Sequence, residues 1–265
     1  MTARSTSSGS NVGPPGRTLS RGEVHLWFLF PDIPQLHEPA LLEAYRRLLT
    51  EDELHRQQRY LQAVHRHQAL VARALVRTTL SRYEEVPPDR WRFALGPHGR
   101  PEIAEPAAGG LSFNLSHTTG LMVCAVTRER GVGVDVEDTR RRVSSLQIAR
   151  RFFAPAEVRQ LEAGTSAFCD FWTLKEAYLK ARGAGLSLPL RRFSFRLVGE
   201  DIAVSFEPDL KDDQAAWRFA LLRPTSWHTA ALAVRGRAPI LAAAGQVIPL
   251  RTESGMPCGV VARSR

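Results

Sequence analysis

Lysine, cysteine and long apolar runs are all scarce in this 265-residue chain. Of its 36 basic residues, only Lys175, Lys180 and Lys211 are lysines, and the rest are arginines. No apolar run approaches the roughly 18 residues that a membrane-spanning helix needs; residues 239–250 are too few and include two prolines. We therefore predict no membrane segment. Two of the three lysines lie within residues 171–180, which makes that segment the first candidate for chemistry, and for chemistry on phosphate in particular.

Cysteine and the N-terminal residues also exclude some classes of protein. Cys124, Cys169 and Cys258 are too few and too widely spaced for a disulfide framework or a metal-binding pattern, so we expect reduced thiols. The first 21 residues are rich in Ser, Gly and Pro and lack the apolar core of a signal peptide. They predict a disordered arm on a cytoplasmic protein.

The formal charge of +9 calls for an anionic partner. A basic surface would attract a phosphate-bearing small molecule, an acidic protein or a nucleic acid. The arginines are spread along the whole chain, however, and no helix-turn-helix, zinc-finger or RNP-like motif accompanies them. We predict no nucleic-acid partner, although a nucleic-acid-binding protein stays open as an alternative that steeply salt-dependent binding to generic DNA or RNA would reveal.

Residues 167–182 have the pattern of a helix. Apolar side chains recur three and four residues apart from Phe168 onward, Asp170 lies in the first turn, and Gly183 follows the last. Glu176 and Lys180 are then neighbours on one face. Such a pair is most often a solvent-exposed ion pair that stabilises the helix by about 0.2–0.5 kcal/mol. A catalytic pair is the alternative, because lysine is otherwise so rare in this chain.

A second acidic segment lies upstream. Residues 131–138 have the pattern of a strand in which Asp135 and Glu137 project from the same face, whereas the alternating valines face the other way. Two adjacent carboxylates repel each other unless a cation lies between them. A strand running into a polar turn is the simpler interpretation. If the pair faces a site, Asp135, Glu137 and Glu176 would hold Mg²⁺, with Mn²⁺ as an alternative, together with phosphate oxygens.

The two segments resemble the signature motifs of the Sfp-type 4′-phosphopantetheinyl transferases, which move the phosphopantetheine arm of coenzyme A to a serine of a carrier protein. The family's Ser-His segment, Gly-Lys-Pro turn and loop after the catalytic helix also have similar counterparts. Five motifs in the right order are far more specific than any one of them. The matching residues are 131–138, 172–180, 113–118, 99–101 and 183–190, within a resemblance that covers about 22–235.

The resemblance implies an α+β fold of two similar α/β subdomains in a pseudo-twofold arrangement. After the arm at 1–21 we expect an N-terminal subdomain at 22–128, a C-terminal subdomain with the metal and catalytic motifs at 129–235, and a loosely ordered tail at 236–265. The wider superfamily also contains a shorter, trimeric form, and the length of this chain favours a monomer. Expected helices span 38–49, 50–83, 144–162 and 167–182.

The resemblance also implies catalytic roles, with coenzyme A as co-substrate and 3′,5′-ADP as the second product. Glu176 would take the proton of the carrier serine, and Lys180 would neutralise charge at the phosphates. His117, with Ser116, would hydrogen-bond the pyrophosphate or the 3′-phosphate. A lone histidine in an apolar strand is more often structural, and only the Ser-His context favours a site role here. Lys175 would pair with phosphate nearby.

The adenosine end of coenzyme A is where this chain departs from the family. Gly99, Arg100 and Pro101 would border the adenine and the 3′-phosphate, as the Gly-Lys-Pro turn does in the family. The central basic position of the first long helix holds Gln68 instead. The basic residues that could replace the missing contact to the 3′-phosphate are Arg56, Arg66, Arg73 and Arg100.

The segment between the two acidic motifs is where the family docks its acidic carrier protein. Val143, Leu146, Phe152 and Phe153 are candidates for an apolar patch, although at least one of the phenylalanines fits a buried core position better. Arginines would surround the patch and meet an acidic helix; they are Arg140, Arg141, Arg142, Arg150 and Arg151. A non-catalytic carrier or coenzyme A binder is the third alternative, and the intact acidic set argues against it.

Overall fold

The computed structural model describes residues 18–20, 22–141, 145–183, 185–237, 241–251, 253–255 and 259–264. Some of the sequence-based expectations fall outside these ranges: most of the arm at 1–21, the docking residues Arg142 and Val143, and Cys258. In the described ranges, no helix is both long and apolar enough to cross a bilayer. The fold is α+β, as the sequence predicted.

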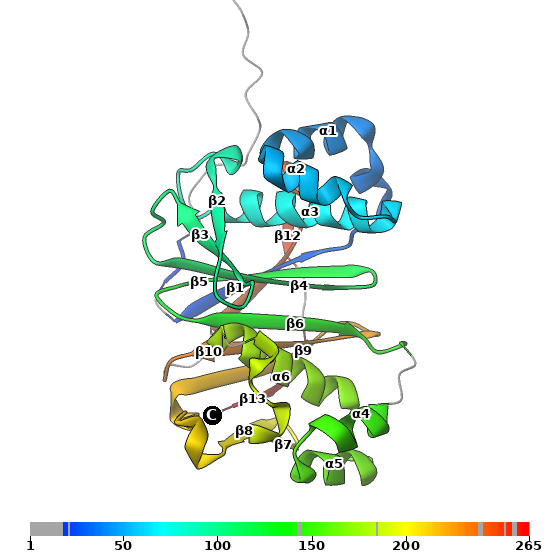
Figure 1. The fold of residues 1–265 in the computed structure, drawn as a ribbon, viewed down its shortest axis with the longest axis vertical. Coiled ribbons are helices and arrows are strands. Elements are labelled where there is room, and N and C mark those ends of the chain that lie inside the picture. Colours follow the sequence, from blue (N-terminus) through cyan, green and yellow to red (C-terminus); the bar gives the residue numbers. More distant parts are fainter. Residues whose placement is uncertain are drawn as a thin grey trace, which may run out of the picture.

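The upper half in Figure 1 is a five-stranded sheet with three helices over its outer face. The strand order is β12-β11-β1-β5-β4, and a separate ribbon, β2-β3, lies beside the helices. The elements of this half are β1 (Glu23–Leu29), α1 (Pro39–Leu48), α2 (Glu51–Gln58), α3 (Ala63–Leu80), β2 (Arg92–Leu95), β3 (Pro101–Glu105), β4 (Leu111–Thr118), β5 (Leu121–Arg128), β11 (Leu241–Val247) and β12 (Glu253–Gly255).

The lower half repeats this plan with a six-stranded sheet and three helices beneath it. Its strand order is β6-β10-β9-β13-β8-β7. The elements are β6 (Val132–Asp138), α4 (Ser145–Phe152), α5 (Pro155–Glu162), α6 (Phe168–Arg182), β7 (Phe193–Val198), β8 (Asp201–Phe206), β9 (Trp217–Thr225), β10 (His228–Arg235) and β13 (Gly259–Arg263).

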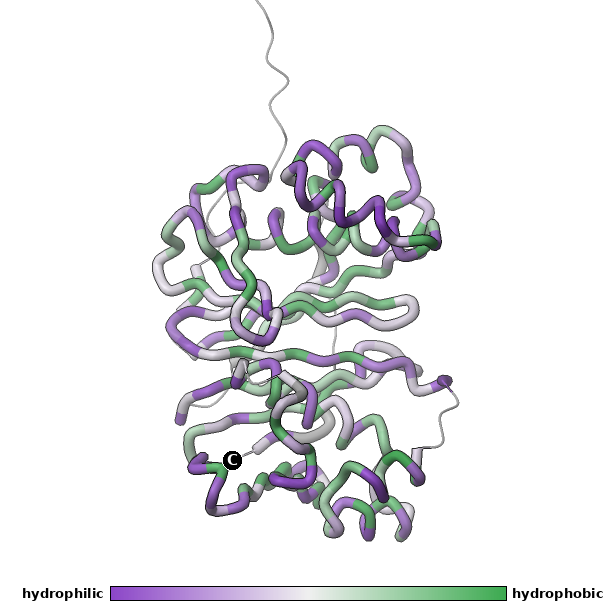
Figure 2. Tube along the Cα trace, viewed as in Figure 1, coloured by the Kyte–Doolittle hydropathy of each residue, from purple (hydrophilic) through white to green (hydrophobic). Residues whose placement is uncertain are grey.

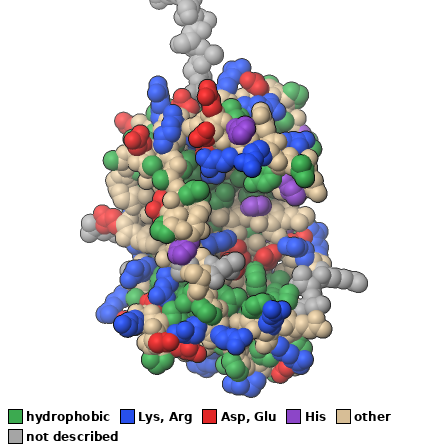
Figure 3. Space-filling view, viewed as in Figure 1, with side chains coloured by type: hydrophobic (Ala, Val, Ile, Leu, Met, Phe, Trp, Pro, Cys, Tyr) green, Lys and Arg blue, Asp and Glu red, His purple; other side chains and the backbone are tan. Residues whose placement is uncertain are grey.

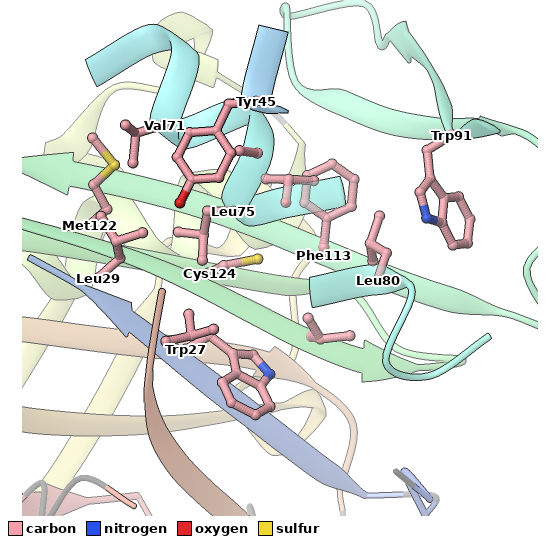
Figure 4. Packing of buried hydrophobic residues seen from close by; sticks show 14 of the residues in the cluster. Trp27, Leu29, Tyr45, Val71, Leu75, Leu80, Trp91, Phe113, Met122 and Cys124 are labelled. Atoms are coloured by element: carbon pink, nitrogen blue, oxygen red, sulfur yellow. The ribbon is translucent and has the colours of Figure 1, made fainter. Parts of the chain in front are cut away.

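Alternation along the strands divides the apolar side chains among three layers. Trp27 and the residues two positions from it along β1 face the upper helices. Figure 4 shows Leu75 of α3 over Cys124 of β5 in this layer. The other face of β1, including Leu26, meets the valines of β6 between the two sheets. A third cluster packs around α6. Figure 2 shows the same division, with hydrophobic residues along the strands and hydrophilic ones on the outer helices and turns.

The two halves meet where β4 and β6 run side by side in Figure 1. These strands belong to different sheets, and side chains of β4 bridge the seam. Asn114, Ser116 and Thr118, at every second position of β4, accept hydrogen bonds from the backbone N–H groups of Val134, Val136 and Asp138 at 2.8, 3.3 and 3.3 Å. This ladder fixes which β6 side chains emerge opposite the Ser-His segment.

A glycine lets α6 approach β6 closely. A Cβ atom at Gly133 would lie 2.1 Å from the carbonyl oxygen of Ala177 and 2.4 Å from the backbone nitrogen of Ala181. No side chain fits that space, so the helix backbone rests directly on the strand. The contact lies two residues before Asp135 and brings the last two turns of α6 over the acidic end of β6.

Two expected helices are each broken in the structure. The capping box of Thr50 and Glu53 forms as the sequence indicates, but the expected helix 50–83 divides into α2 and α3 around residues 59–62. Side chains hold that turn: Gln57 donates to the Arg66 carbonyl oxygen at 2.8 Å, and Arg66 donates back to the carbonyl oxygens of Tyr60 and Leu61. The expected helix 144–162 divides before Pro155, which begins α5.

The expectation of a loosely ordered tail at 236–265 is wrong for its described strands. β11 pairs in parallel with β1, and β13 lies between β9 and β8, so the tail contributes to both sheets. Val247 is 1% exposed in the upper core. Without β11, β1 would present an unpaired sheet edge. The small apolar residues of this segment look like a linker in sequence, although they fit a buried strand equally well.

Candidate active site

Three side chains from the two halves meet at the seam. The Lys180 ammonium, from α6, donates to Asp135 Oδ1 at 2.7 Å, to Ser116 Oγ at 2.9 Å and to the Val134 carbonyl oxygen at 3.2 Å. Ser116, from β4, donates to the same Asp135 oxygen at 2.8 Å. The sequence motifs predicted that these residues share one site, and the structure brings them into direct contact.

The second oxygen of Asp135 is the unusual atom of the site. Oδ2 is buried and has no hydrogen-bond partner among the described residues. A buried carboxylate oxygen without a partner is costly. Since Oδ1 already receives the ammonium and the hydroxyl, Oδ2 is the atom left to meet a cation or a ligand.

Two further carboxylates lie close enough to affect one another. Desolvation, and then the negative charge of Asp135, raises the pKa of Glu137 above its ordinary value, although Arg141 and Lys180 oppose this and Trp172 donates a hydrogen bond. Desolvation and Asp135 likewise raise the pKa of Glu176, with Lys180 opposing and Glu137 adding to the rise. The three carboxylates therefore repel one another in the folded protein.

This donor set fits a hard divalent cation of the Mg²⁺ type. Such an ion prefers oxygen ligands. It would offset the repulsion between the carboxylates and give Asp135 Oδ2 a partner. The array is open: in the described ranges, no three His, Cys, Asp or Glu side chains form a ready metal cage. Mg²⁺ commonly keeps waters and takes substrate phosphates as ligands, so an open array suits it.

His117 lines a hollow of about 440 Å³ in the upper half, between α3 and β4. Desolvation, and then the charge of Lys180, lowers its pKa, with Asp135 opposing and His65 adding to the fall. The imidazole is therefore mostly neutral near pH 7. Gln68 and Arg73 of α3 and Pro101 also line this hollow. On the face drawn in Figure 3, basic side chains are spread over both halves, and histidine side chains lie over the upper half and near its border with the lower half.

A neighbouring hollow of about 740 Å³ shares Arg73 and Pro101 with the first. Arg56 lies on its wall. The Nε atom of Arg73 is also 3.8 Å from Oε1 of Glu53. Two of the four arginines predicted for the 3′-phosphate therefore face the hollows that adjoin His117. Sequence reasoning missed His65. The turn between α2 and α3 places it near His117.

Other predicted contacts are used differently. Arg66 donates to the Tyr60 and Leu61 carbonyl oxygens and lines neither hollow. The Ser116 hydroxyl donates once and accepts from Lys180 and Val136, which fills its hydrogen-bonding capacity. Gly99, with φ +78°, forms the turn before Arg100, and both border a small hollow beside Glu176 and Lys180.

The expectation that Lys175 binds phosphate is wrong. Its ammonium is fully buried, 2.9 Å from Glu157, and donates to the carbonyl oxygens of Leu190 and Phe193 at 2.7 Å each. Burial lowers its pKa to about 8, although Glu157 opposes the shift. Lys175 lies one residue before Glu176, so on a helix it points about 100° away from it. The sequence contains Glu157 but no signal that pairs it with Lys175.

The predicted docking segment is partly a surface and partly core. Phe153 is 3% exposed and stacks on Phe168, whereas Phe152 is 44% exposed. Leu146 is half-buried. Beside them a hollow of about 190 Å³ leads to Glu137, and Arg141 forms part of its rim. Its apolar lining comes from Ile148, Phe168 and Trp172.

Comparison with known proteins points in one direction. Residues 131–234 match the family model described as the 4′-phosphopantetheinyl transferase superfamily, and 37–129 match the 4′-phosphopantetheinyl transferase N-terminal model. The chain is 35% identical over 230 residues to the 4′-phosphopantetheinyl transferase HetI of Nostoc, covering 84% of this chain and 92% of that one. It is 34% identical over 192 residues to the 4′-phosphopantetheinyl transferase Sfp of Bacillus subtilis, covering 70% and 82%.

Proposed function

Because the chain belongs to the 4′-phosphopantetheinyl transferase superfamily, we propose that it transfers the 4′-phosphopantetheine group of coenzyme A to a serine of an acidic carrier protein and releases 3′,5′-ADP. The observation that carries this proposal is the meeting of Lys180, Ser116 and Asp135 at the seam, with Asp135 Oδ2 unpartnered and two mutually repelling carboxylates beside it.

The carboxylates would hold the cation on which the reaction depends. Asp135, Glu137 and Glu176 supply the oxygen ligands, and a bound Mg²⁺ would offset negative charge on the pyrophosphate. Lys180 supplies a further positive charge at the same place. Its side chain is 28% exposed, so the ammonium can turn from Asp135 toward a phosphate oxygen when the substrate binds.

The reaction needs a base and an aligned nucleophile. The serine oxygen of the carrier forms a bond to the β-phosphorus of coenzyme A, and the bond from that phosphorus to the bridging oxygen breaks, leaving the electron pair on 3′,5′-ADP. Glu176 accepts the serine proton. Its raised pKa makes it a stronger base than an ordinary glutamate.

The remaining residues hold the two substrates. Neutral His117 donates or accepts a hydrogen bond at the phosphates, and Arg56 and Arg73 attract the anionic adenosine end in the adjoining hollows. The carrier docks on Leu146, Phe152 and the hollow beside Glu137, with Arg141 at its rim. Apolar contact and basic flanks together suit an acidic amphipathic helix.

The decisive experiment is intact mass spectrometry of apo carrier proteins of several pathways after incubation with the chain, coenzyme A and Mg²⁺. We expect a mass gain of one phosphopantetheine, loss of the reaction in excess EDTA, and loss of at least about 100-fold in rate for Lys180→Ala. Lys211→Ala, at a lysine outside the site, is the matched control and should keep the wild-type rate. Absence of transfer to every carrier would overturn the proposal.

A further inference from the structure

Arg100 lies in a tight turn between β2 and β3, yet its side chain reaches across the seam. The turn is closed by hydrogen bonds from Gly96 N to the Arg100 carbonyl oxygen and from Gly99 N to that of Gly96. The guanidinium Nη1 donates to the carbonyl oxygen of Lys180 at 2.5 Å and to that of Ala181 at 3.4 Å, and Nη2 donates to that of Phe113 at 3.2 Å.

The acceptors belong to the two elements that build the site. Lys180 and Ala181 are in the last turn of α6, whose carbonyl groups lack the usual helical partner four residues on. The Lys180 carbonyl oxygen also accepts from the Gly183 N–H at 3.2 Å. Phe113 is on β4, three residues before Ser116. A cation at a helix C-terminus also interacts favourably with the helix dipole. Arg100 thus joins the catalytic helix of one half to the Ser-His strand of the other.

The same lysine is held at both ends. Its carbonyl oxygen receives Arg100, and its ammonium lies on Asp135 and Ser116. Arg100 Nε is buried and has no partner among the described residues, so it is closed off from water. A lysine at position 100 would offer a single nitrogen in place of Nη1 and Nη2, which here reach α6 and β4 separately as two arms of a planar fork.

We propose that Arg100 is a positioning residue, which fixes the end of α6 and with it Lys180 against β4, and that it does not bind the 3′-phosphate. This inference rests on the proposed function, in which Lys180 acts at the phosphates. It replaces the role implied for Arg100 by the Gly-Lys-Pro turn of the family with one that the hydrogen bonds of this chain support.

Kinetics with coenzyme A and 3′-dephospho-coenzyme A separate the two roles. For a positioning residue, Arg100→Ala lowers kcat about 10- to 100-fold with both donors, because small misplacements of a reacting group are costly. The ratio of kcat/KM between the donors stays at the wild-type value, and Arg100→Lys does not restore kcat. For a phosphate ligand, Arg100→Ala raises KM and narrows the donor ratio, and Arg100→Lys restores both; that result would overturn the proposal.

Arg128→Ala is the matched control. Arg128 also donates to carbonyl oxygens of two separate segments, those of Gly109 and Tyr83, far from α6. Its loss should lower the melting temperature without lowering kcat at a temperature where the protein is folded. A decrease in kcat in this variant as large as that in Arg100→Ala would mean that general loosening explains both, and would overturn the positioning role.

Lysine-selective ¹⁵N labelling tests the geometry without any turnover, since the chain has only three lysines. Three amide signals are expected, assigned with Lys211→Arg and Lys180→Arg. Arg100→Ala should shift the Lys180 signal and leave those of Lys175 and Lys211 in place, and Arg128→Ala should shift none. An unmoved Lys180 signal refutes the positioning role of Arg100 even if transfer occurs. A shifted Lys180 signal in a chain that transfers nothing refutes only the proposed function.

Discussion

At the scale of single residues, Lys175 and Lys180 show how five positions on a helix separate a buried structural ammonium from one that faces the seam. Lys175 faces the core and Glu157, and Lys180 faces the seam and Asp135. Their shared motif and the rarity of lysine made both look functional. Sequence reasoning placed Lys180 correctly at the acidic residues because that contact lies between two motifs, and it could not find Glu157, which belongs to neither.

Lys175→Met should therefore damage stability without damaging substrate binding. Removing one partner of a buried ion pair costs about 3–5 kcal/mol, because the other charge is left unpaired. We expect chemical denaturation to show this loss, Lys175→Met/Glu157→Gln to recover part of it, and the KM for coenzyme A to stay at the wild-type value in the folded fraction. A KM for coenzyme A that rises in Lys175→Met and not in Lys211→Met would show that Lys175 contributes to substrate binding after all.

Glu176→Gln should have opposite effects on activity and on stability. A carboxyl whose pKa is raised on folding contributes stability below its ordinary pKa of 4.5 and loses it as the pH rises through the raised value. At pH 7 in EDTA the variant should thus melt at a higher temperature than the wild type, and addition of Mg²⁺ should raise its melting temperature less. Turnover should fall by about 10²–10⁴-fold if Glu176 is the base. Equal melting temperatures across pH 4–8 in EDTA would contradict this account.

Arg73→Ala tests the replacement for the basic contact that Gln68 lacks. Arg73 lines both hollows near His117. A contact to the distant 3′-phosphate binds substrate and transition state equally, so KM for coenzyme A should rise with kcat nearly unchanged. The preference for coenzyme A over 3′-dephospho-coenzyme A should narrow. Arg66→Ala is the control, since Arg66 lines neither hollow and is held by the carbonyl oxygens of Tyr60 and Leu61. An equal rise in KM in this variant would show that Arg73 is not the specific contact to the 3′-phosphate.

At the scale of elements, the sequence predicts α6 well and the other long helices less well. Asp170 in the first turn and Gly183 after the last mark the two ends of α6, and Pro155 marks the break before α5. The break between α2 and α3 has no such signal, because residues 59–62 all tolerate a helix. Contacts from Gln57 and Arg66 across the turn decide it, and such contacts exist only once the two helices have packed.

Gly133→Ala should disturb the site through the placement of α6. A methyl group there would need space now held by the backbone of Ala177 and Ala181, whereas at Gly131 the nearest atom would be 3.1 Å away. We expect a loss of about 1–3 kcal/mol in the free energy of unfolding for Gly133→Ala, together with a fall in kcat, and smaller effects for Gly131→Ala. Equal effects of the two substitutions would show that α6 can move to admit a methyl group. Its close contact with β6 would then not determine the geometry of the site.

At the scale of the whole molecule, the residues of the candidate site belong to neither half alone. Ser116 and His117 come from the upper sheet, Asp135 and Glu137 from the lower sheet, and Lys180 from the helix beneath it. Motif order in the sequence predicted this collection. It could not predict the seam ladder from β4 to β6, because side-chain bridges between sheet edges leave no periodic pattern, nor that the last residues of the chain return to both sheets.

Those last residues supply the final prediction, which concerns the integrity of both halves. β11 covers the edge of β1, and β13 lies within the lower sheet, so a chain ending at Arg237 loses β11 and β12 from the upper sheet and β13 from the lower one. It should melt far below the full chain or fail to remain soluble, instead of behaving as a protein freed of a loose tail. Val247→Asp should act in the same direction by burying a charge that costs several kcal/mol. Ala243→Asp, at an exposed position of the same strand, should not. Circular dichroism melts of the three variants test this, and a shortened chain with wild-type melting would show that β11 and β13 are dispensable to the fold.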